Sequence, residues 1–336
     1  MCSDRRPSGI SSSSPPSRSS TSSSSFRLPG SPNGSSIGLP PPHAEPVHHA
    51  PTRPVRAVTA SFDWSILALL LGVAVAAGIG GGILAGLLGV GGGIVIVPAL
   101  YLSLGLADMD PALRMQVAVA TSLATIVFTA LSSGRSHHRK GAVDMALLRR
   151  WAPWIVLGVV LGALLGSVVD GRLMVAVFAV VASAVAVNML VGRGRVAPEP
   201  RTAPPAAWAA AGIGAGAVSA LMGIGGGTVC VPLLSWLGYD IRRAVGTSAA
   251  LGFLIGAPGT IVYMVSGLGQ TGLPPFSLGY VNLLAVAIIT PFTMYFATWG
   301  ARIAHAIPMR ALRICFGLFL AATAIRMALD LWANGT

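Results

Sequence analysis

Two glycine segments carry the clearest chemical signal in this sequence. Gly89-Val-Gly-Gly-Gly93 is followed by Pro98, and Gly223-Ile-Gly-Gly-Gly227 is followed by Pro232. Consecutive glycines predict a tight turn, and a proline disturbs the helix around it. A helix that begins at such a turn presents free N–H groups and the positive end of its dipole, both of which attract anions. The simpler alternative is that the glycines only allow helices to pack closely.

Hydroxyl side chains form a second candidate group. Thr121-Ser122 recurs as Thr247-Ser248, and Thr121, Thr125 and Thr129 share one face of a helix because they are spaced four residues apart. These hydroxyls could donate hydrogen bonds to the oxygens of an anion. Alternatively, they bond to neighbouring helices or to carbonyls of their own helix. The predicted substrate-binding residues are Gly91, Gly92, Gly93, Pro98, Thr121, Ser122, Gly225, Gly226, Gly227, Pro232, Thr247 and Ser248.

The composition indicates what must position these residues. Of the 336 residues, 54% are hydrophobic and only 10% are charged, against about 25% charged in soluble proteins. A spanning helix needs about 20 apolar residues, and backbone in lipid must satisfy its own hydrogen bonds. We therefore predict an all-α polytopic membrane protein whose surroundings are a lipid bilayer. The runs without Asp, Glu, Lys or Arg are 64–107, 115–134, 151–169, 173–192, 202–239 and 244–301.

The chain divides into four predicted regions. Residues 1–61 are rich in Ser and Pro and predict a disordered tail, which is either a solvated segment or the product of a wrongly assigned start. A first transmembrane repeat is expected over 62–196, and a Pro-rich cytoplasmic linker over 197–205. A second transmembrane repeat is expected over 206–336.

Charge indicates how the two repeats are oriented. The loop 134–150 holds five Lys or Arg residues, whereas its counterpart 267–279 holds none. The positive-inside rule then places these loops on opposite sides of the membrane, which predicts inverted repeats in a protein with several spans. Thirteen positive residues then lie in inner loops and two in outer loops. Each of 66–104 and 206–237 becomes a broken or re-entrant pair of helices with a glycine segment at its bend.

The sequence argues against metal binding, catalysis and nucleic-acid binding. The three cysteines are scattered without metal-ligand spacing, and the apolar runs contain no His or acid, so no catalytic residue, metal or cofactor is predicted. An anion that carries its own proton suits a chain without a coupling carboxylate. The net charge of +12 lies mostly in the tail and loops, so it indicates membrane orientation and not nucleic-acid binding. The cluster 137–140 is either such an orientation signal or an electrostatic funnel for anions.

Residues 65–331 resemble the TauE/SafE family of sulfite exporters and related transporters. The resemblance rests on GLLGVGGGIVIVPAL, ALMGIGGGTVCVPLL, the ATSL and GTSA segments, and SSGRSHHRKGAVD. It implies a secondary transporter, in this case an exporter, that moves sulfite, sulfonates or related organosulfur anions across the plasma (inner) membrane. It also carries the site onto 91–93 and 225–227. Substrates differ among members, and the Ser-rich tail departs from the family pattern. An anion-selective channel and an intramembrane enzyme are the alternatives.

Overall fold

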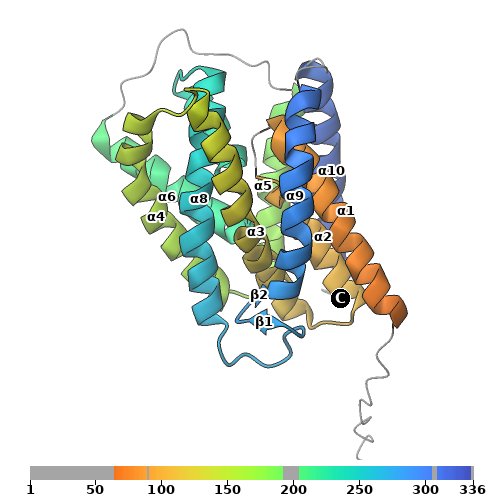
Figure 1. The fold of residues 1–336 in the computed structure, drawn as a ribbon. Helices are drawn as coiled ribbons and strands as arrows, with labels where there is room; N and C mark the ends of the chain where they lie inside the picture. The colour runs from red at the N-terminus through yellow and green to blue at the C-terminus, as the bar shows by residue number, and fades with distance from the viewer. Residues whose placement is uncertain (1–63, 89–90, 192–203, 305–308, 334–336) are drawn as a thin grey trace, which may run out of the picture. The chain divides into compact units, whose positions relative to one another are not determined.

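The fold is a set of helices with one short hairpin. The computed structural model describes residues 64–88, 91–191, 204–304 and 309–333, so the predicted tail and most of the predicted linker lie outside the described residues. The elements are α1 (Trp64–Leu88), α2 (Gly93–Leu106), α3 (Pro111–Arg139), α4 (Met145–Val168), α5 (Gly171–Val191), α6 (Pro205–Met222), α7 (Gly226–Trp236), α8 (Ile241–Ser266), β1 (Ser277–Leu278), β2 (Val281–Asn282), α9 (Leu283–Ala304) and α10 (Met309–Ala333). Figure 1 shows their order along the chain.

The length and apolar character of the helices confirm the predicted polytopic membrane fold. Within the described residues, six helices are long and apolar enough to cross a bilayer: α3, α4, α5, α6, and residues 242–266 and 283–300 of α8 and α9. The helices α2 and α7 are shorter, with 14 and 11 residues. Each follows a glycine segment, so each half contains one helix too short to span the bilayer alone.

Local sequence signals explain where several helices begin. Asp110, Asp144 and Asp240 are the N-cap residues of α3, α4 and α8, and each side chain accepts a hydrogen bond from a backbone N–H of the first turn. The cap at Asp144 starts α4 early, and α3 continues to Arg139. The connection predicted over 134–150 is therefore only five residues long, because both helices extend beyond their apolar runs.

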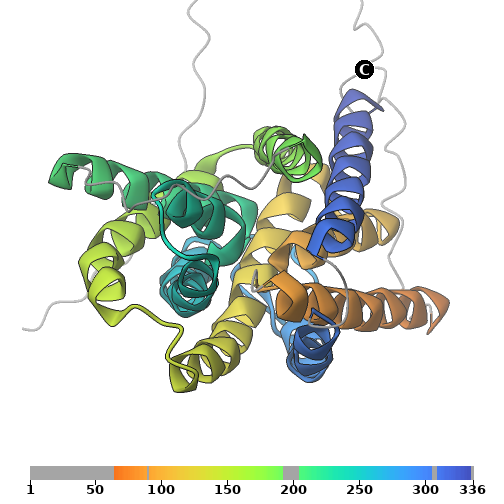
Figure 2. The ribbon, with the colours of Figure 1, turned by 90° about the horizontal axis from the view of Figure 1, so that it is seen from above.

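Helices from the two halves of the chain are interleaved. Helix α1 packs on α9, α6 on α4, α3 on α8, and α5 on α10 (Figures 1 and 2). Glycines make the first two contacts close: a Cβ at Gly82 would lie 2.7 Å from Thr293 O, and one at Gly162 would lie 2.5 Å from Ala217 O. Each of these two pairs joins an early helix of one half to a later helix of the other.

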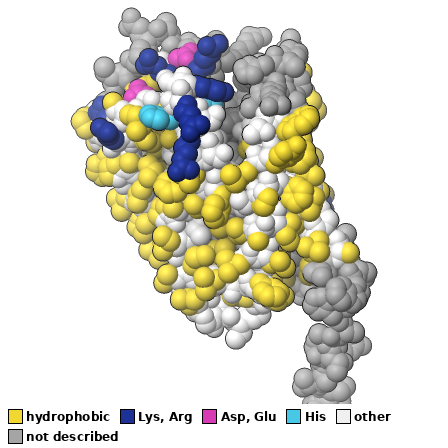
Figure 3. Space-filling model, viewed as in Figure 1, with side chains coloured by type: hydrophobic (Ala, Val, Ile, Leu, Met, Phe, Trp, Pro, Cys, Tyr) yellow, Lys and Arg dark blue, Asp and Glu magenta, His cyan; other side chains and the backbone are white. Residues whose placement is uncertain are grey.

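The two ends of the helical region differ in charge. The α3–α4 connection lies at one end and the β1–β2 hairpin at the other (Figure 1). Lys, Arg and His side chains gather near the α3–α4 connection (Figure 3), where the exposed residues are Arg135, His138, Arg139, Lys140, Arg149, Arg150, Arg242 and Arg243. This placement agrees with inverted repeats, which remain an inference from charge and pairing.

Candidate functional site at the glycine turns

The two glycine segments lie directly against one another. A Cβ at Gly91 would lie 3.6 Å from Gly225 Cα, and a Cβ at Gly93 would lie 2.5 Å from Gly223 O. Ile126 of α3 borders the same contact, 2.9 Å from the Gly93 position. Two segments more than 120 residues apart in sequence thus meet backbone to backbone, with no room for a side chain at Gly93.

The first segment is a turn that requires glycine. Gly91 and Gly92 have φ values of 78° and 74°, in the left-handed region that L side chains rarely adopt. A Cβ at Gly92 would also lie 2.8 Å from Gly81 O of α1. Helix α2 begins at Gly93, and Gly92 O accepts from Val95 N at 3.1 Å. The earlier Gly89 lies outside the described residues.

The second segment has a different backbone. Its left-handed residue is Gly223, with φ of 64°, which ends α6, whereas Gly225 is extended. Gly226 and Gly227 are the first residues of α7, so the expectation of a turn through all three glycines is wrong here. Because the first N–H groups of a helix have no intrahelical acceptor, these two glycines supply the donors at the start of α7.

The two predicted prolines lie away from the turns. Pro98 and Pro232 are inside α2 and α7, beyond the first turn, and both helices continue past them. Pro98 is buried and Pro232 is half-buried. The structure therefore places both prolines in the helices that follow the glycines and not beside the free N–H groups.

The four repeated hydroxyl residues are completely buried but differ in their partners. Ser122 Oγ donates to Gly223 O at 2.7 Å, which links α3 to the second glycine segment. Thr121 Oγ1 accepts from Asn282 N, and Thr247 Oγ1 accepts from Asp144 N, each at 3.0 Å. Ser248 Oγ has no hydrogen-bond partner in the described structure. Sequence repetition alone did not distinguish these roles.

Other polar side chains have structural partners. Thr125 Oγ1 donates to Ser122 O at 2.7 Å, and Thr129 Oγ1 donates to Thr125 O at 3.2 Å, so both bond to carbonyls of their own helix. Gln116 Nε2 donates to Val169 O at 2.9 Å. These side chains therefore bond to backbone carbonyls of the protein, as expected for a structural role and not for a role in binding an anion.

Three of the four buried hydroxyl oxygens without a partner among the described residues lie on α6, α7 and α8. They belong to Ser219, Ser235 and Ser248, and the fourth belongs to Thr290 of α9. A buried polar group without a partner has a desolvation cost, which a bound ligand or water could offset. The sequence analysis missed Ser219 and Ser235 because each is a single serine in an apolar run, without repetition or spacing.

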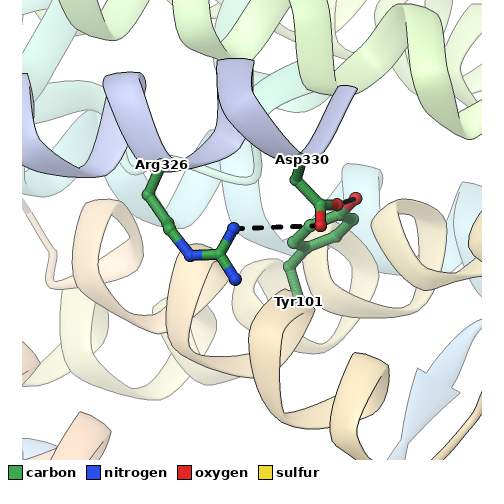
Figure 4. Close-up of polar contacts among 3 residues, drawn as sticks. All are labelled: Tyr101, Arg326 and Asp330. Atoms are coloured by element: carbon green, nitrogen blue, oxygen red, sulfur yellow. Dashed lines mark hydrogen bonds and ion pairs between the residues drawn. The ribbon is translucent and has the colours of Figure 1, made fainter. Parts of the chain in front are cut away.

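A polar contact anchors the far half of α2. The hydroxyl of Tyr101 donates to Asp330 Oδ2 of α10 at 2.5 Å, and Arg326 Nη1 lies 4.0 Å from Asp330 Oδ1 (Figure 4). Neither repetition nor spacing in the sequence pointed to Tyr101. Across the described residues, no group of three or more His, Cys, Asp or Glu could hold a metal ion.

An aromatic cluster lies beside the basic end. Trp151 Nε1 donates to Trp208 O at 3.0 Å, and Arg150 Cζ lies 5.6 Å from the centre of the Trp208 ring. Burial raises the pKa of the neighbouring Tyr239 phenol, and the charge of Asp144 acts in the same direction while Arg150 opposes it. Tyr239 therefore stays neutral at physiological pH, next to the start of α4.

Comparison with known proteins places the chain among membrane transporters. A model of the family described as "Sulfite exporter TauE/SafE" matches residues 57–327. A "Probable membrane transporter protein" of Haemophilus influenzae is 36% identical over 268 residues, which cover 80% of this chain and 99% of that protein. "Probable membrane transporter protein YunE" of Bacillus subtilis is 27% identical, covering 69% of this chain and 87% of that protein. No solved structure matches the chain.

Proposed function

Because the chain belongs to the sulfite exporter TauE/SafE family, we propose that it is a secondary transporter of small sulfur-containing anions. It is a multi-pass membrane transporter and not an enzyme, in keeping with its family, its named relatives and its six candidate spans. The proposal adds the solute class, which is sulfite, sulfonates or related organosulfur anions. It also adds export across the plasma membrane.

The observation that carries the proposal is the start of α7. Gly226 and Gly227 are the first residues of α7, so their N–H groups have no acceptor within the helix. A Cβ at Gly226 would lie 3.0 Å from Ser248 O, so α7 begins against α8. Ser248 contributes a buried hydroxyl without a partner. A helix start carries about half a positive elementary charge, so it can stabilise an anion without a Lys or Arg side chain.

The start of α2 lies next to this position. Gly93 approaches Gly223, so the first turns of α2 and α7 belong to one region. An oxyanion presents several acceptor oxygens, which suits a site made of backbone N–H groups and hydroxyls. No Asp or Glu occurs in residues 64–107 or 202–239, which contain both glycine segments, so an anion meets no opposing carboxylate within them.

The contact between the glycine segments favours a carrier over a channel. The 2.5 Å approach between the Gly93 position and Gly223 O leaves no space for a side chain, and the surrounding hydroxyls are buried. A carrier opens its site to one side at a time, whereas an open channel would need a continuous path. The channel remains an outcome of the test below.

Flux into proteoliposomes tests this proposal. Purified protein is reconstituted, and uptake of labelled sulfite, thiosulfate, sulfoacetate and taurine is measured with and without a pH gradient. We expect uptake of at least one of them to saturate with concentration and to be accelerated by the same anion on the opposite side. Non-saturating flux without exchange would favour a channel. Transport of cations or neutral sugars alone would overturn the proposal.

A further inference from the structure

Two long-range hydrogen bonds link the halves of the chain in a reciprocal way. Thr247 of α8 accepts from the N–H of Asp144, which precedes α4, and Thr121 of α3 accepts from the N–H of Asn282, which precedes α9. Both distances are 3.0 Å, and both threonines are completely buried. Each threonine thus holds the start of a helix that belongs to the other half.

The residues that precede the two helices also match in their local chemistry. Asp144 Oδ1 accepts from Leu147 N at 3.0 Å, and Asn282 Oδ1 accepts from Ala285 N at 2.8 Å, so each side chain caps the first turn of its own helix. A capping residue's own N–H has no intrahelical acceptor. The threonine hydroxyl supplies that acceptor from a separate helix.

Each threonine is followed by a serine that lies at the glycine turns. Ser122 donates to Gly223 O, and Ser248 O lies 3.0 Å from where a Cβ of Gly226 would be. The Thr-Ser pairs therefore connect the glycine turns to two different places. One is the start of α4 at the basic end, and the other is the start of α9 at the hairpin end (Figure 1).

We propose that Thr121 and Thr247 are positioning residues that close the path to the glycine turns, each from its own end. Thr247 holds α4 against α8 at the basic end, and Thr121 holds α9 against α3 at the hairpin end. Release of one bond opens its own end and leaves the other closed. This inference rests on the proposed transport function, since a carrier must open its two ends separately.

The two ends are held unequally. Asn282 Nδ2 also donates to Pro275 O at 2.9 Å and to Ser277 Oγ at 3.2 Å, which ties the start of α9 to the hairpin. The side chain of Asp144 carries no N–H group that could donate such bonds. Loss of the Thr247 bond should therefore open the basic end more than loss of the Thr121 bond opens the hairpin end.

The native Cys230 provides a reporter for both ends. It lies on α7, four residues after Gly226, and it is completely buried. A buried thiol reacts slowly because burial disfavours the thiolate, so its labelling reports opening.

In a chain carrying Cys2→Ser and Cys315→Ser, a membrane-impermeant maleimide is applied to right-side-out and to inverted vesicles. Single cysteines at the exposed positions His138 and Thr271, introduced into separate chains that also carry Cys230→Ser, identify which end each vesicle presents.

Thr247→Val should raise the rate of Cys230 labelling from the basic end alone, by about threefold to tenfold, as expected for loss of one hydrogen bond. Thr121→Val should raise it from the hairpin end alone, and by less. Thr247→Ser and Thr121→Ser keep the hydroxyl and should restore the parent rates. Thr260→Val is the matched control, because the buried Thr260 hydroxyl bonds to Gly256 O of its own helix at 2.7 Å and, among the described residues, to no other helix.

Faster labelling from both ends in either valine variant would overturn the proposal, because it would indicate general loosening. Unchanged labelling in both variants, or an equal increase with Thr260→Val, would overturn it as well. Anion flux is measured on the same preparations. Absent flux in the parent chain would overturn the proposed transport function, whereas the sidedness of labelling tests the two threonines independently.

Discussion

The helix pairs α1–α2 and α6–α7 contain the same glycine pattern but use it differently. The first pair turns through two left-handed glycines, Gly91 and Gly92, and its second helix is anchored to α10 by Tyr101. The second pair turns at Gly223 alone, and α7 begins at the second glycine of its triplet, whereas α2 begins at the third. Near α2 the serine of α3 is hydrogen-bonded, whereas near α7 the equivalent Ser248 is not.

The two helix pairs therefore form two different sides of the candidate site. The side at α2 has its hydroxyl hydrogen-bonded, whereas the side at α7 has hydroxyls without partners. The Ser122 bond satisfies Gly223 O, which lies over the start of α2. Ser219, Ser235 and Ser248 keep hydroxyls without partners around α6, α7 and α8. We therefore expect changes around α2 to disturb the structure of the site most, and changes at Ser248 to affect the affinity for the substrate most.

The largest effect is expected from a side chain at Gly92. Gly92→Ala forces a non-glycine residue to φ of 74° and places its Cβ 2.8 Å from a backbone oxygen, so flux should fall more than tenfold. The left-handed conformation alone costs about 1–2 kcal/mol. Gly226→Ala meets its nearest atom at 3.0 Å and has no left-handed φ, so it should retain more flux. Flux is normalised to folded protein in the membrane.

A control isolates the steric part of that prediction. Gly141 has φ of 67° but no atom within 4 Å of its Cβ position. Gly141→Ala should therefore have the conformational cost without the overlap. If Gly141→Ala and Gly92→Ala reduced flux equally, close packing at the first glycine turn would not explain the loss.

The next largest effect separates the two serines. Ser122→Ala leaves the buried Gly223 carbonyl without its donor, which should lower the free energy of unfolding by about 1–3 kcal/mol. Ser248→Ala removes a hydroxyl that has no partner, so stability should change little while the KM for the anion rises several-fold. Thermal unfolding in detergent and concentration-dependent flux give the two readouts. An unchanged KM in Ser248→Ala would remove Ser248 from the site.

A smaller effect is expected at the anchor of α2. Tyr101→Phe removes the hydrogen bond to Asp330 but keeps the buried ring, and the loss should be about 1 kcal/mol of stability. Ser235, at the corresponding place on α7, has no partner, so Ser235→Ala should be close to neutral. Equal destabilisation by both variants would contradict the difference drawn between α2 and α7.

The smallest effect is expected at Arg326. This side chain is 58% exposed, and its ion pair with Asp330 spans 4.0 Å, so Arg326→Gln should change stability by less than about 1 kcal/mol. Any loss should disappear at high salt because exposed charges are screened. A loss as large as that of Tyr101→Phe would show that Arg326, and not the tyrosine, is the main anchor.

Much of the architecture follows from the sequence because it is encoded locally. Charge-free runs identify the helices, and the glycine repeats identify the breaks in them. The start of α4 at Met145 precedes its charge-free run, because the Asp144 cap begins the helix earlier. Partners are not local. Thr121 accepts a hydrogen bond from Asn282 N, 161 positions away in the sequence. Asp330 accepts one from the Tyr101 hydroxyl, 229 positions away. Neither spacing nor composition specifies which distant group faces a given hydroxyl.

The two glycine segments show the same limit at the level of the backbone. Their letters match, yet Gly92 is left-handed while Gly226 is helical. The difference depends on neighbours: Gly92 packs against Gly81 of α1, whereas Gly226 packs against Ser248 of α8. Repetition therefore points to the places where the helices break, while the conformation of each residue depends on tertiary contacts.

The most direct test of the account is an experimental structure with a transported anion bound. Selenite is an analogue of sulfite that can be located by the anomalous scattering of selenium, provided that it competes for flux. We predict selenium density beside the first turn of α7, with oxygens about 2.7–3.2 Å from the N–H groups of Gly226 or Gly227 and from Ser248 Oγ. Selenium density elsewhere in the helical region would contradict the claim that the anion binds at the glycine turns.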